Sequence, residues 1–396
     1  MKKLRTNLVA MAIGVSSIPV IFAAQVATAG VAYTVTDLGS LGGSITEAFG
    51  INNQGEVVGE STTAINPSNG TGGYGQPFLW KPTIPNGTTG TMYSLDPGYS
   101  SSSYVGQGLA INGLGQVAGV EGTSAGYKTF LWTPSQNNGV TGSLVNLNVP
   151  VNAGTWVYGM SSSGQVVGVT GSAASSEAFL WQPDVTNGTT GSTQNLGFLP
   201  GGTTSWAGGI NDNGQVVGGS NNTAFIWTAS SGMLPLTTPT GDGSAGEEIN
   251  KAGEAVGYLV TGNTVGGATT YTYHAAIWSS AGLQELPTLG GLNSAAMDVN
   301  NSGDVVGWSQ TSNGNTDLFV YDNGVMTDLS TLTGYTFGSV YGINDAGQII
   351  ADYIGASNNR TAYLLTPVTT PEPAALSVMM LALDAILLTK RRLCRD

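Results

Sequence analysis

Cysteine and histidine are almost absent from this chain of 396 residues, which has one of each, Cys394 and His274. A single cysteine cannot form a disulfide framework within the chain. Zinc sites built from several Cys or His ligands are excluded by count. A Ser-His-Asp or Cys-His arrangement would need His274 as its base, and one imidazole at a repeated position favours a structural role. We therefore expect no catalytic residue.

Basic residues are also scarce, with 11 Lys and Arg against 24 Asp and Glu. Seven of the 11 basic residues and three of the 24 acidic residues lie in the two terminal segments, residues 1–29 and 367–396. The region between these segments has four basic and 21 acidic residues, a net charge of about −17. This charge excludes a nucleic-acid partner, which needs basic stripes to neutralise phosphate. No cofactor or metal is predicted. Calcium remains an alternative at the turns Asn211–Gly214 and Asn344–Gly347, although neither has EF-hand ligand spacing.

No window of the repeated region shows a sustained 3.6-residue period, and glycine accounts for 60 residues. Helix is therefore not expected there. The chain has instead a pattern of Gly-Gln-Val-Val-Gly, or a near variant, followed some 10 to 20 residues later by Ala-Phe-Leu-Trp. The first motif glycine recurs at intervals of 39 to 60 residues, as Gly55, Gly115, Gly164, Gly214, Gly253, Gly303 and Gly347. Periods of this size indicate solenoids, propellers or arrays.

Each repeat contains four short segments that suit β-strands. In the fourth copy these are Ala207–Ile210, Gln215–Gly218, Ala224–Trp227 and Gly232–Leu236, with a tight turn at Asn211–Gly214. Four strands per repeat correspond to one propeller blade. The aromatic residue that ends the third strand is expected to pack between blades, and the glycine after Val-Val to lie where the backbone kinks.

The order of the segments predicts a closed ring. The chain opens with a lone fourth-type segment, Tyr33–Gly39, whereas no such segment follows the last third-type segment, Ala362–Leu365. The N-terminal strand can complete the last blade and leave no unpaired edge. We predict an all-β fold, a seven-bladed β-propeller over residues 30–366, with an irregular β-solenoid or a split sandwich as alternatives.

The N-terminus has the form of a signal peptide. Lys2, Lys3 and Arg5 precede an apolar run, and Ala27-Thr28-Ala29 has the small-X-small pattern of a signal-peptidase site. Residues 1–29 are therefore expected to be removed on export.

The C-terminus has three parts. A linker, residues 367–373, ends in Pro371-Glu372-Pro373, and residues 374–396 contain an apolar stretch interrupted by Asp384, expected to form a short transmembrane helix. Sixteen residues are short for a permanent span, and the positive charge after them fits retention of the tail on the cytoplasmic side. An ordinary membrane anchor is the alternative to a sorting signal. The basic residues are Lys390, Arg391, Arg392 and Arg395.

This ending resembles the PEP-CTERM sorting signal of Gram-negative bacteria that make extracellular polysaccharide. The resemblance implies processing by an exosortase-type transpeptidase, a location at the cell envelope or extracellular surface, and membrane contact only through residues 374–396 before processing. The repeats resemble the HAF family of probable extracellular repeat proteins, through Asp37–Gly43, Ile51-Asn52 and the segment from His274 to Trp278. That resemblance implies location and architecture, and it brings no assigned catalytic residue.

Three functions remain open. The first is a non-catalytic binding or structural module of the envelope or extracellular polysaccharide matrix. The second is a carbohydrate-active enzyme with paired carboxylates, for which Glu247, Glu248 and Asp298 are candidates, although strand alternation sends Glu247 and Glu248 to opposite faces. The third is a partner-recognition propeller with an exposed apolar face.

The two longest insertions, Thr62–Gly75 and Val260–Tyr273, each join a second strand to a third. We expect them to be irregular loops on the same face of the ring. Possible ligand-binding residues in them are Tyr74, Tyr271 and Tyr273.

Overall fold

The structure is a computed structural model. The predicted signal peptide (1–29), the Pro371–Pro373 motif and the C-terminal segment (374–396) lie outside the residues that it describes. None of the helices it describes is long and apolar enough to cross a membrane. The described residues are 32–65, 73–99, 105–150, 155–172, 175–239, 243–265, 268–355 and 359–368.

Antiparallel β-strands form five sheets of four strands and one sheet of eight. The four-stranded sheets, each in chain order, are β6 (Gly106–Ile111), β7 (Val117–Thr123), β8 (Gly126–Pro134) and β9 (Gly142–Asn146); β10 (Trp156–Met160), β11 (Val166–Thr170), β12 (Glu177–Pro183) and β13 (Gly191–Gly197); β14 (Ser205–Ile210), β15 (Val216–Ser220), β16 (Thr223–Thr228) and β17 (Gly232–Pro235); β18 (Gly243–Ile249), β19 (Ala255–Val265), β20 (Ala268–Ser279) and β21 (Gly282–Glu285); and β22 (Gly290–Val299), β23 (Val305–Thr311), β24 (Thr316–Asp322) and β25 (Val325–Asp328).

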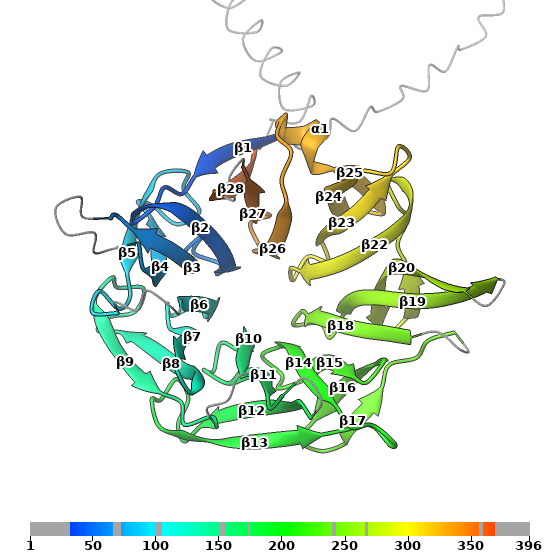
Figure 1. Ribbon diagram of the computed structural model, residues 1–396, viewed down its shortest axis with the longest axis horizontal. Helices are drawn as coiled ribbons and strands as arrows, with labels where there is room; N and C mark the ends of the chain where they lie inside the picture. The colour runs from blue at the N-terminus through cyan, green and yellow to red at the C-terminus, as the bar shows by residue number, and fades with distance from the viewer. Residues whose placement is uncertain are drawn as a thin grey trace, which may run out of the picture. The chain divides into compact units, whose positions relative to one another are not determined.

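The eight-stranded sheet contains both ends of the described chain. One half is β2 (Gly42–Ile51), β3 (Val57–Thr63), β4 (Gly75–Pro82) and β5 (Gly90–Ser94), and the other is β26 (Ser339–Ile343), β27 (Ile349–Ile354), β28 (Arg360–Val368) and β1 (Ala32–Asp37). A single parallel pair, Ile45 with Arg360, joins the halves. Figure 1 shows the sheets arranged around a central opening, with the first strand of each repeat innermost. The chain is a β-propeller, as its sequence predicts.

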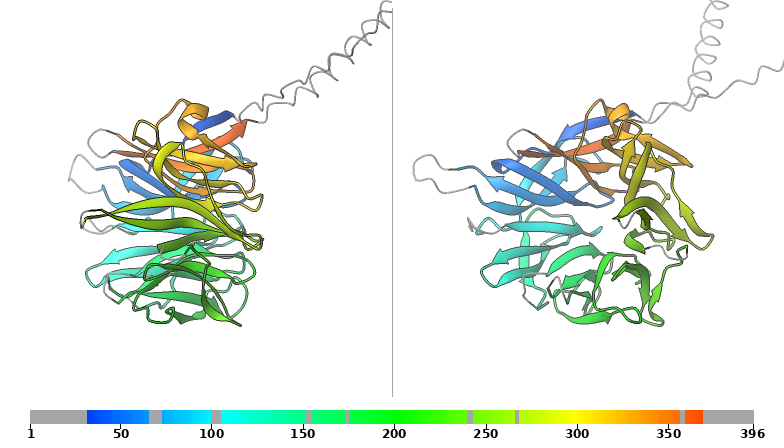
Figure 2. Two further views of the ribbon diagram at one scale, coloured as in Figure 1. Left: turned by 90° about the vertical axis from the view of Figure 1, so that its right-hand side faces the viewer. Right: turned by 45° about the vertical axis from the view of Figure 1, so that its right-hand side comes forward.

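The first strand of the chain pairs with the last. β1 runs antiparallel to β28 from Ala32 opposite Val368 to Asp37 opposite Tyr363, and Leu38 N–H donates to the Ala362 carbonyl at 3.1 Å. The two strands can be followed side by side in both views of Figure 2. The predicted pairing of the N-terminal strand with the last repeat is therefore confirmed.

Repeated aromatic side chains fill the spaces between neighbouring sheets. Trp181 on β12 lies in one buried cluster with Leu131 and Leu147 of the preceding sheet, and Trp227 on β16 lies in another with Leu180. Each large ring buries on the order of 150 to 250 Å². Contacts between sheets are therefore a main source of stability, as the sequence predicts.

The innermost strand of every repeat has a β-bulge at the same place. The pairing with the second strand skips one residue, so the inner strand kinks there. The skipped residues are Phe49, Leu109, Tyr158, Gly208, Glu247, Met297 and Tyr341. The glycine after Val-Val lies opposite the bulge: a Cβ added to Gly59 would collide with the Glu47 carbonyl oxygen. The glycine therefore lies opposite the kink, where the backbone of the inner strand comes close, and the seventh repeat has Ala351 at this position.

Two expectations about local structure are wrong. A short helix, α1 (Leu329–Thr333), follows β25, with the Asp328 side chain capping its N-terminus and Gly334 in the left-handed region at its C-terminus. The expected irregular loop Val260–Tyr273 is a hairpin extension of β19 and β20, paired from Val260–Tyr273 outward to Val265–Ala268. Its Thr and Tyr residues suit a pleated backbone, and this local propensity accounts for the strands.

Asp352 on β27 is buried where the two halves of the eight-stranded sheet meet. Its Oδ1 accepts a hydrogen bond from the Ala48 N–H at 3.2 Å, whereas Oδ2 is buried without a hydrogen-bond partner among the described residues. The pKa of Asp352 is raised to about 8, mainly by burial and also by the charge of Glu47. The hydrogen bond from the Ala48 N–H and the charge of Arg360 oppose this rise. The ionised carboxylate is therefore unfavourable in the folded state.

We expect Asp352→Asn to stabilise the protein at pH 8 by roughly 2 kcal/mol. The folded pKa lies above the unfolded value of 3.8, so the native chain binds the extra proton, and this group's contribution to stability falls as pH rises from about 4 to 8. Urea unfolding should show that the free energy of unfolding falls less between pH 5 and pH 8 in the variant than in the parent protein. An unchanged pH dependence would contradict the assignment.

Candidate functional site

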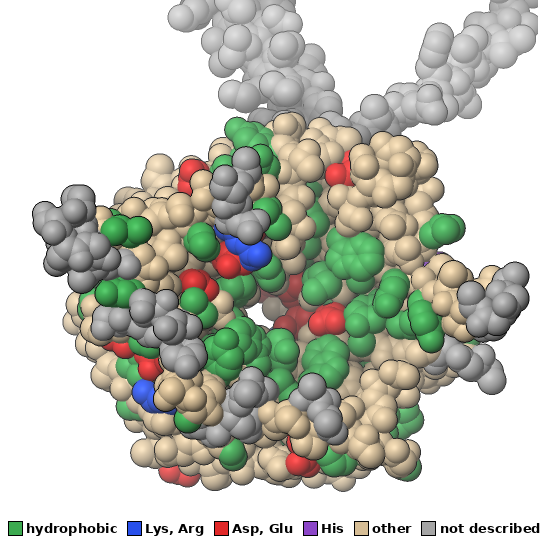
Figure 3. All heavy atoms as spheres, in the orientation of Figure 1, with side chains coloured by type: hydrophobic (Ala, Val, Ile, Leu, Met, Phe, Trp, Pro, Cys, Tyr) green, Lys and Arg blue, Asp and Glu red, His purple; other side chains and the backbone are tan. Residues whose placement is uncertain are grey.

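The central opening of the ring is a cavity of about 340 Å³. Its lining comes from the inner strands and from the turns that follow them. The turns contribute mostly Asn residues, and the strands contribute Phe49, Tyr158, Tyr341, Glu248 and Asp298. Figure 3 shows hydrophobic side chains gathered around the opening, with acidic side chains at its wall.

Six Asn residues at equivalent turn positions form what we call the amide ring. Each Oδ1 accepts a hydrogen bond from the backbone N–H four residues later, and each Nδ2 donates to the Glu, Gln or Asp side chain there at 2.7 to 3.0 Å. Five of them also donate to the Asn carbonyl of the next repeat at 2.9 to 3.2 Å. The amide ring is Asn52, Asn112, Asn211, Asn250, Asn300 and Asn344.

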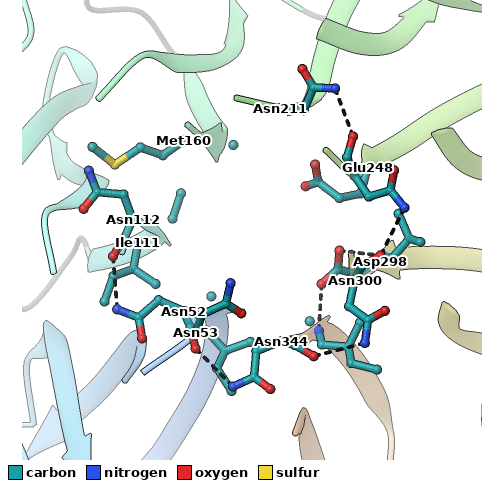
Figure 4. A pocket seen from close by; sticks show the side chains of 18 of the residues that line it. Asn52, Asn53, Ile111, Asn112, Met160, Asn211, Glu248, Asp298, Asn300 and Asn344 are labelled. Carbon is teal, nitrogen blue, oxygen red and sulfur yellow. Dashed lines mark hydrogen bonds between the residues drawn. The ribbon is translucent and has the colours of Figure 1, made fainter. Parts of the chain in front are cut away.

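The ring is interrupted where Ser161 takes the Asn position. Its hydroxyl lies 2.9 Å from that of Ser163 and reaches no neighbouring repeat. Asn112, on the preceding repeat, donates instead to Asn187 Oδ1 at 3.1 Å. Figure 4 shows the labelled amides around the opening, with hydrogen bonds running from one repeat to the next. The amide groups are thus used to hold repeats together.

The acidic turn residues are also occupied by contacts between repeats. Asp345 accepts hydrogen bonds from the Asn301 and Asn53 side chains at 2.9 and 2.7 Å, and Asp212 accepts one from the Ser162 N–H at 2.9 Å. In the part of the chain that the structure describes, no group of three or more His, Cys, Asp and Glu could hold a metal ion. The turns considered for calcium thus contribute hydrogen bonds between neighbouring repeats.

Glu248 and Asp298 are the residues directly after the bulge on β18 and β22, the inner strands of two neighbouring sheets. Other repeats have Gly or Ala there, and a Cβ at Gly209 would collide with the Glu248 carboxyl group. Figure 4 shows both carboxylates at the wall of the opening. Asp298 accepts hydrogen bonds from the Val299 and Ile343 N–H groups, both at 2.7 Å.

Burial raises the pKa of both carboxyl groups. The pKa of Asp298 rises to about 6, against the opposing effect of its two backbone donors. The pKa of Glu248 rises well above its usual range because of burial and the charge of Asp298. The bulge suspends the strict alternation expected for Glu247 and Glu248, and of the two only Glu248 is among the lining residues.

Glu247 is the skipped residue of the bulge and lies near Tyr158 and Tyr258, whose pKa values its charge raises. Burial raises the pKa of Glu247 to about 7. Tyr158 packs edge-on against Trp206 with ring centroids 6.0 Å apart, and Tyr258 against Tyr273 at 5.7 Å. This places an acidic group among aromatic rings from three successive repeats.

The tyrosines predicted in the insertions do not line the cavity. Tyr271 is 60% exposed on the β19–β20 hairpin, whereas Tyr74 is half-buried beside β4. Tyr273 is the one that approaches the group around Glu247, through Tyr258. His274 lies on β20 opposite Leu259 and is not a lining residue.

Sequence reasoning missed the amide ring and the aromatic side chains near Glu247. A signal for the ring was present, because Asn recurs four residues before Gln, Glu or Asp in nearly every repeat. The aromatic residues come from different strand positions, so no linear pattern relates them.

A second cavity, of about 350 Å³, lies beside Trp278, and its described lining contains no acidic residue. The central cavity is therefore the better candidate for chemistry or recognition.

Comparisons with known proteins identify no relative. No protein family and no curated protein matches the sequence. Among solved structures, TolB from Acinetobacter baumannii is 11% identical, with a TM-score of 0.39 over 80% of this chain and 81% of that one. The PQQ-bound aldose sugar dehydrogenase from Streptomyces coelicolor is 10% identical, with a TM-score of 0.34 over 84% and 98%. Similarity at this level says nothing about activity.

Proposed function

We propose that this chain is an exported repeat protein of a Gram-negative cell envelope or surface, whose ring is a non-catalytic binding or structural module of the extracellular polysaccharide matrix. The resemblances at the C-terminus and in the repeats support this location. A signal peptidase and an exosortase-type transpeptidase would process the two ends. Five four-stranded sheets and the two halves of the eight-stranded sheet support seven blades and the closure inferred from the repeats.

The observation that carries the binding role is the composition of the central cavity. Its amides are occupied in joining repeats, whereas Glu248, Asp298 and the exposed aromatic Tyr158 line an open volume of about 340 Å³. Ligand sites commonly combine apolar and aromatic walls with a few polar groups, in volumes of roughly 300 to 1,000 Å³. The volume suits a small ligand or one unit of a polymer.

The test is binding of the exported protein to a glycan panel that includes extracellular polysaccharide. Tyr158→Ala should weaken binding about tenfold, because truncating an aromatic contact in a site costs on the order of 1 to 2 kcal/mol. Tyr271→Ala on the outer hairpin is the matched control and should bind normally. The reverse result would move the site to the hairpin, and no glycan binding at all would contradict the proposal.

A second candidate function, glycoside hydrolysis, is favoured by one specific observation. Glu248 and Asp298 converge on one cavity from adjacent strands, and both have raised pKa values. Such a mechanism uses one carboxyl group as acid and a second as nucleophile or base. Both Asp298 oxygens are, however, engaged by backbone N–H groups. Release of reducing ends by the parent protein, lost in Glu248→Gln, would establish this function in place of the first.

A further inference from the structure

The carboxylates at the cavity and beside it have no cationic partner among the described residues. The region between the terminal segments contains four Lys and Arg residues. Three of them form ion pairs elsewhere, and the fourth, Lys251, is exposed on a cavity turn and forms no ion pair with a described residue. The three pairs are Lys81 with Glu56, Lys128 with Glu121 and Arg360 with Glu47. Glu247, Glu248 and Asp298 are therefore left without a counter-charge.

Glu247 is the most exceptional of the three. No described residue donates a hydrogen bond to its carboxylate, and its neighbours are Tyr158 on β10, Tyr258 on β19 and Glu248. Charged groups removed from water are normally paired or hydrogen-bonded. Glu247 is half-buried, and the described residues provide it with neither a cation nor a hydrogen-bond donor, so a ligand that supplies positive charge would stabilise its ionised form.

Aromatic rings border the same space on several sides. Tyr158 contacts Trp206 at an interplanar angle of 60°, and Tyr258 contacts Tyr273 at 66°. Phe49 and Tyr341, which line the cavity together with Tyr158, pack edge-on with centroids 5.4 Å apart, whereas Trp206, Tyr258 and Tyr273 lie beside the lining. Figure 3 shows this concentration of hydrophobic side chains around the opening. Ring faces attract organic cations by roughly 0.5 to 2 kcal/mol each.

This combination distinguishes among classes of ligand. A hydrated metal ion prefers several oxygen ligands, and the described residues contain no group of three or more His, Cys, Asp and Glu that could hold one. A neutral sugar would use the rings but would leave the carboxylates uncompensated. An organic ammonium group uses both, because it contacts ring faces and neutralises a carboxylate.

We infer that the rim of the central cavity binds an organic ammonium group, with Glu248 of the lining and the adjacent Glu247 as its counter-charges. Tyr158 of the lining and the neighbouring Trp206 and Tyr258 supply the aromatic contacts. This rests on the proposed binding function and specifies its ligand: the recognised part of the envelope or matrix component carries a fixed or protonated amine. The net charge of about −17 between the terminal segments favours the approach of such a ligand.

The test compares choline with 3,3-dimethylbutan-1-ol, which has the same shape without the charge. Calorimetry on the full exported protein at pH 8 should show saturable binding of choline and at least about tenfold weaker binding of the neutral alcohol. Comparable binding of the two, or no saturable binding of choline, would overturn the inference. This comparison uses the parent protein alone and does not depend on the folding of any variant.

Two matched substitutions locate the charge. Glu247→Gln should weaken choline binding about tenfold, whereas Glu285→Gln, which removes an exposed carboxylate on β21, should change it less than about twofold. Thermal unfolding of both variants verifies that they are folded. Equal effects of the two substitutions would show attraction by net charge alone and would overturn the site.

Acidification should weaken choline binding. The groups facing Glu247 are Tyr158, Tyr258 and Glu248, and Asp298 faces Glu248. The pKa values of the two tyrosines are raised, so both tyrosines stay neutral over this pH range. With pKa values of about 7 for Glu247 and about 6 for Asp298, the site gains protons between pH 8 and pH 5.5 and loses negative charge. Choline keeps its charge throughout, so affinity that is unchanged at pH 5.5 would contradict the inference.

Failure of this inference and failure of the proposed function give different results. If glycan binding is lost in Tyr158→Ala but choline does not affect it, the proposed binding function is supported and the ammonium ligand is contradicted. Absence of both glycan and choline binding removes both. Competition of choline with a bound glycan, abolished in Glu247→Gln, supports both together.

Discussion

Deletion of residues 32–38, which comprise β1 and Leu38, should lower the melting temperature by more than about 10 °C or leave the protein aggregated, because a loss of roughly 5 kcal/mol would be a large part of a domain's stability. The deletion removes the whole antiparallel pairing with β28 and the buried Leu38 side chain, which is 4% exposed. It also leaves β28 as an open edge beside β27. Circular dichroism melting and size-exclusion chromatography provide the measurement.

Point substitutions on the two faces of β1 test the same closure without a deletion. Val35 packs into the cluster that contains Leu365, whereas Thr34, one residue earlier, is exposed. Val35→Asp should therefore destabilise by about 3 kcal/mol or more, and Thr34→Asp by less than about 1 kcal/mol. A synthetic peptide of residues 31–40 should partly restore the melting temperature of the deleted protein. If β1 were dispensable, both substitutions would have equally small effects.

Much of this architecture could be predicted from the sequence because each repeat contains the same local patterns of turn, strand and buried residues. The Asn-X-X-Gly turn, the Val-Val strand and the buried Trp recur, so local patterns identify strands, and the displaced segment Tyr33–Gly39 identifies the closure. The exceptions arose where a single repeat departs from the others. Asp328 and Gly334 cap a helix present in one repeat only, and the Thr and Tyr residues of Val260–Tyr273 extend a hairpin by strand propensity.

The candidate site was only partly accessible to the same reasoning. Glu247, Glu248 and Asp298 were recognisable as acidic residues on inner strands. Other repeats have Gly or Ala at the position of Glu248 and Asp298, and mostly apolar or aromatic residues at the position of Glu247. Their environment depends on a bulge, which breaks the simple alternation of side chains. Trp206 and Tyr158 come from neighbouring repeats and meet only when the ring forms. Contacts between repeats depend on the tertiary arrangement, which the motifs of one repeat do not encode.

The bulges make a second strong prediction, because six of the seven have a glycine opposite them that has no room for a side chain, whereas the seventh has Ala351. A Cβ at Gly59 or Gly218 would collide with the carbonyl oxygen of Glu47 or Trp206, respectively. These contacts are with backbone that takes part in strand pairing, so relief of the collision in these two repeats requires the inner strand to shift. Gly59→Ala should therefore destabilise the protein by about 3 kcal/mol, at the upper end of overpacking costs, and Gly59→Val by more.

Gly113 provides the matched control. No atom lies within 4 Å of a Cβ added there, and the other repeats have Asn, Ser, Asp or Lys at the equivalent turn position. Gly113→Ala should change the free energy of unfolding by less than about 0.5 kcal/mol. Because Gly59 and Gly218 lie in different sheets, the costs of Gly59→Ala and Gly218→Ala should add in the double variant to within about 0.5 kcal/mol. Urea unfolding of the four variants measures this, and a Gly59→Ala protein as stable as Gly113→Ala would show that the bulge carbonyl can give way.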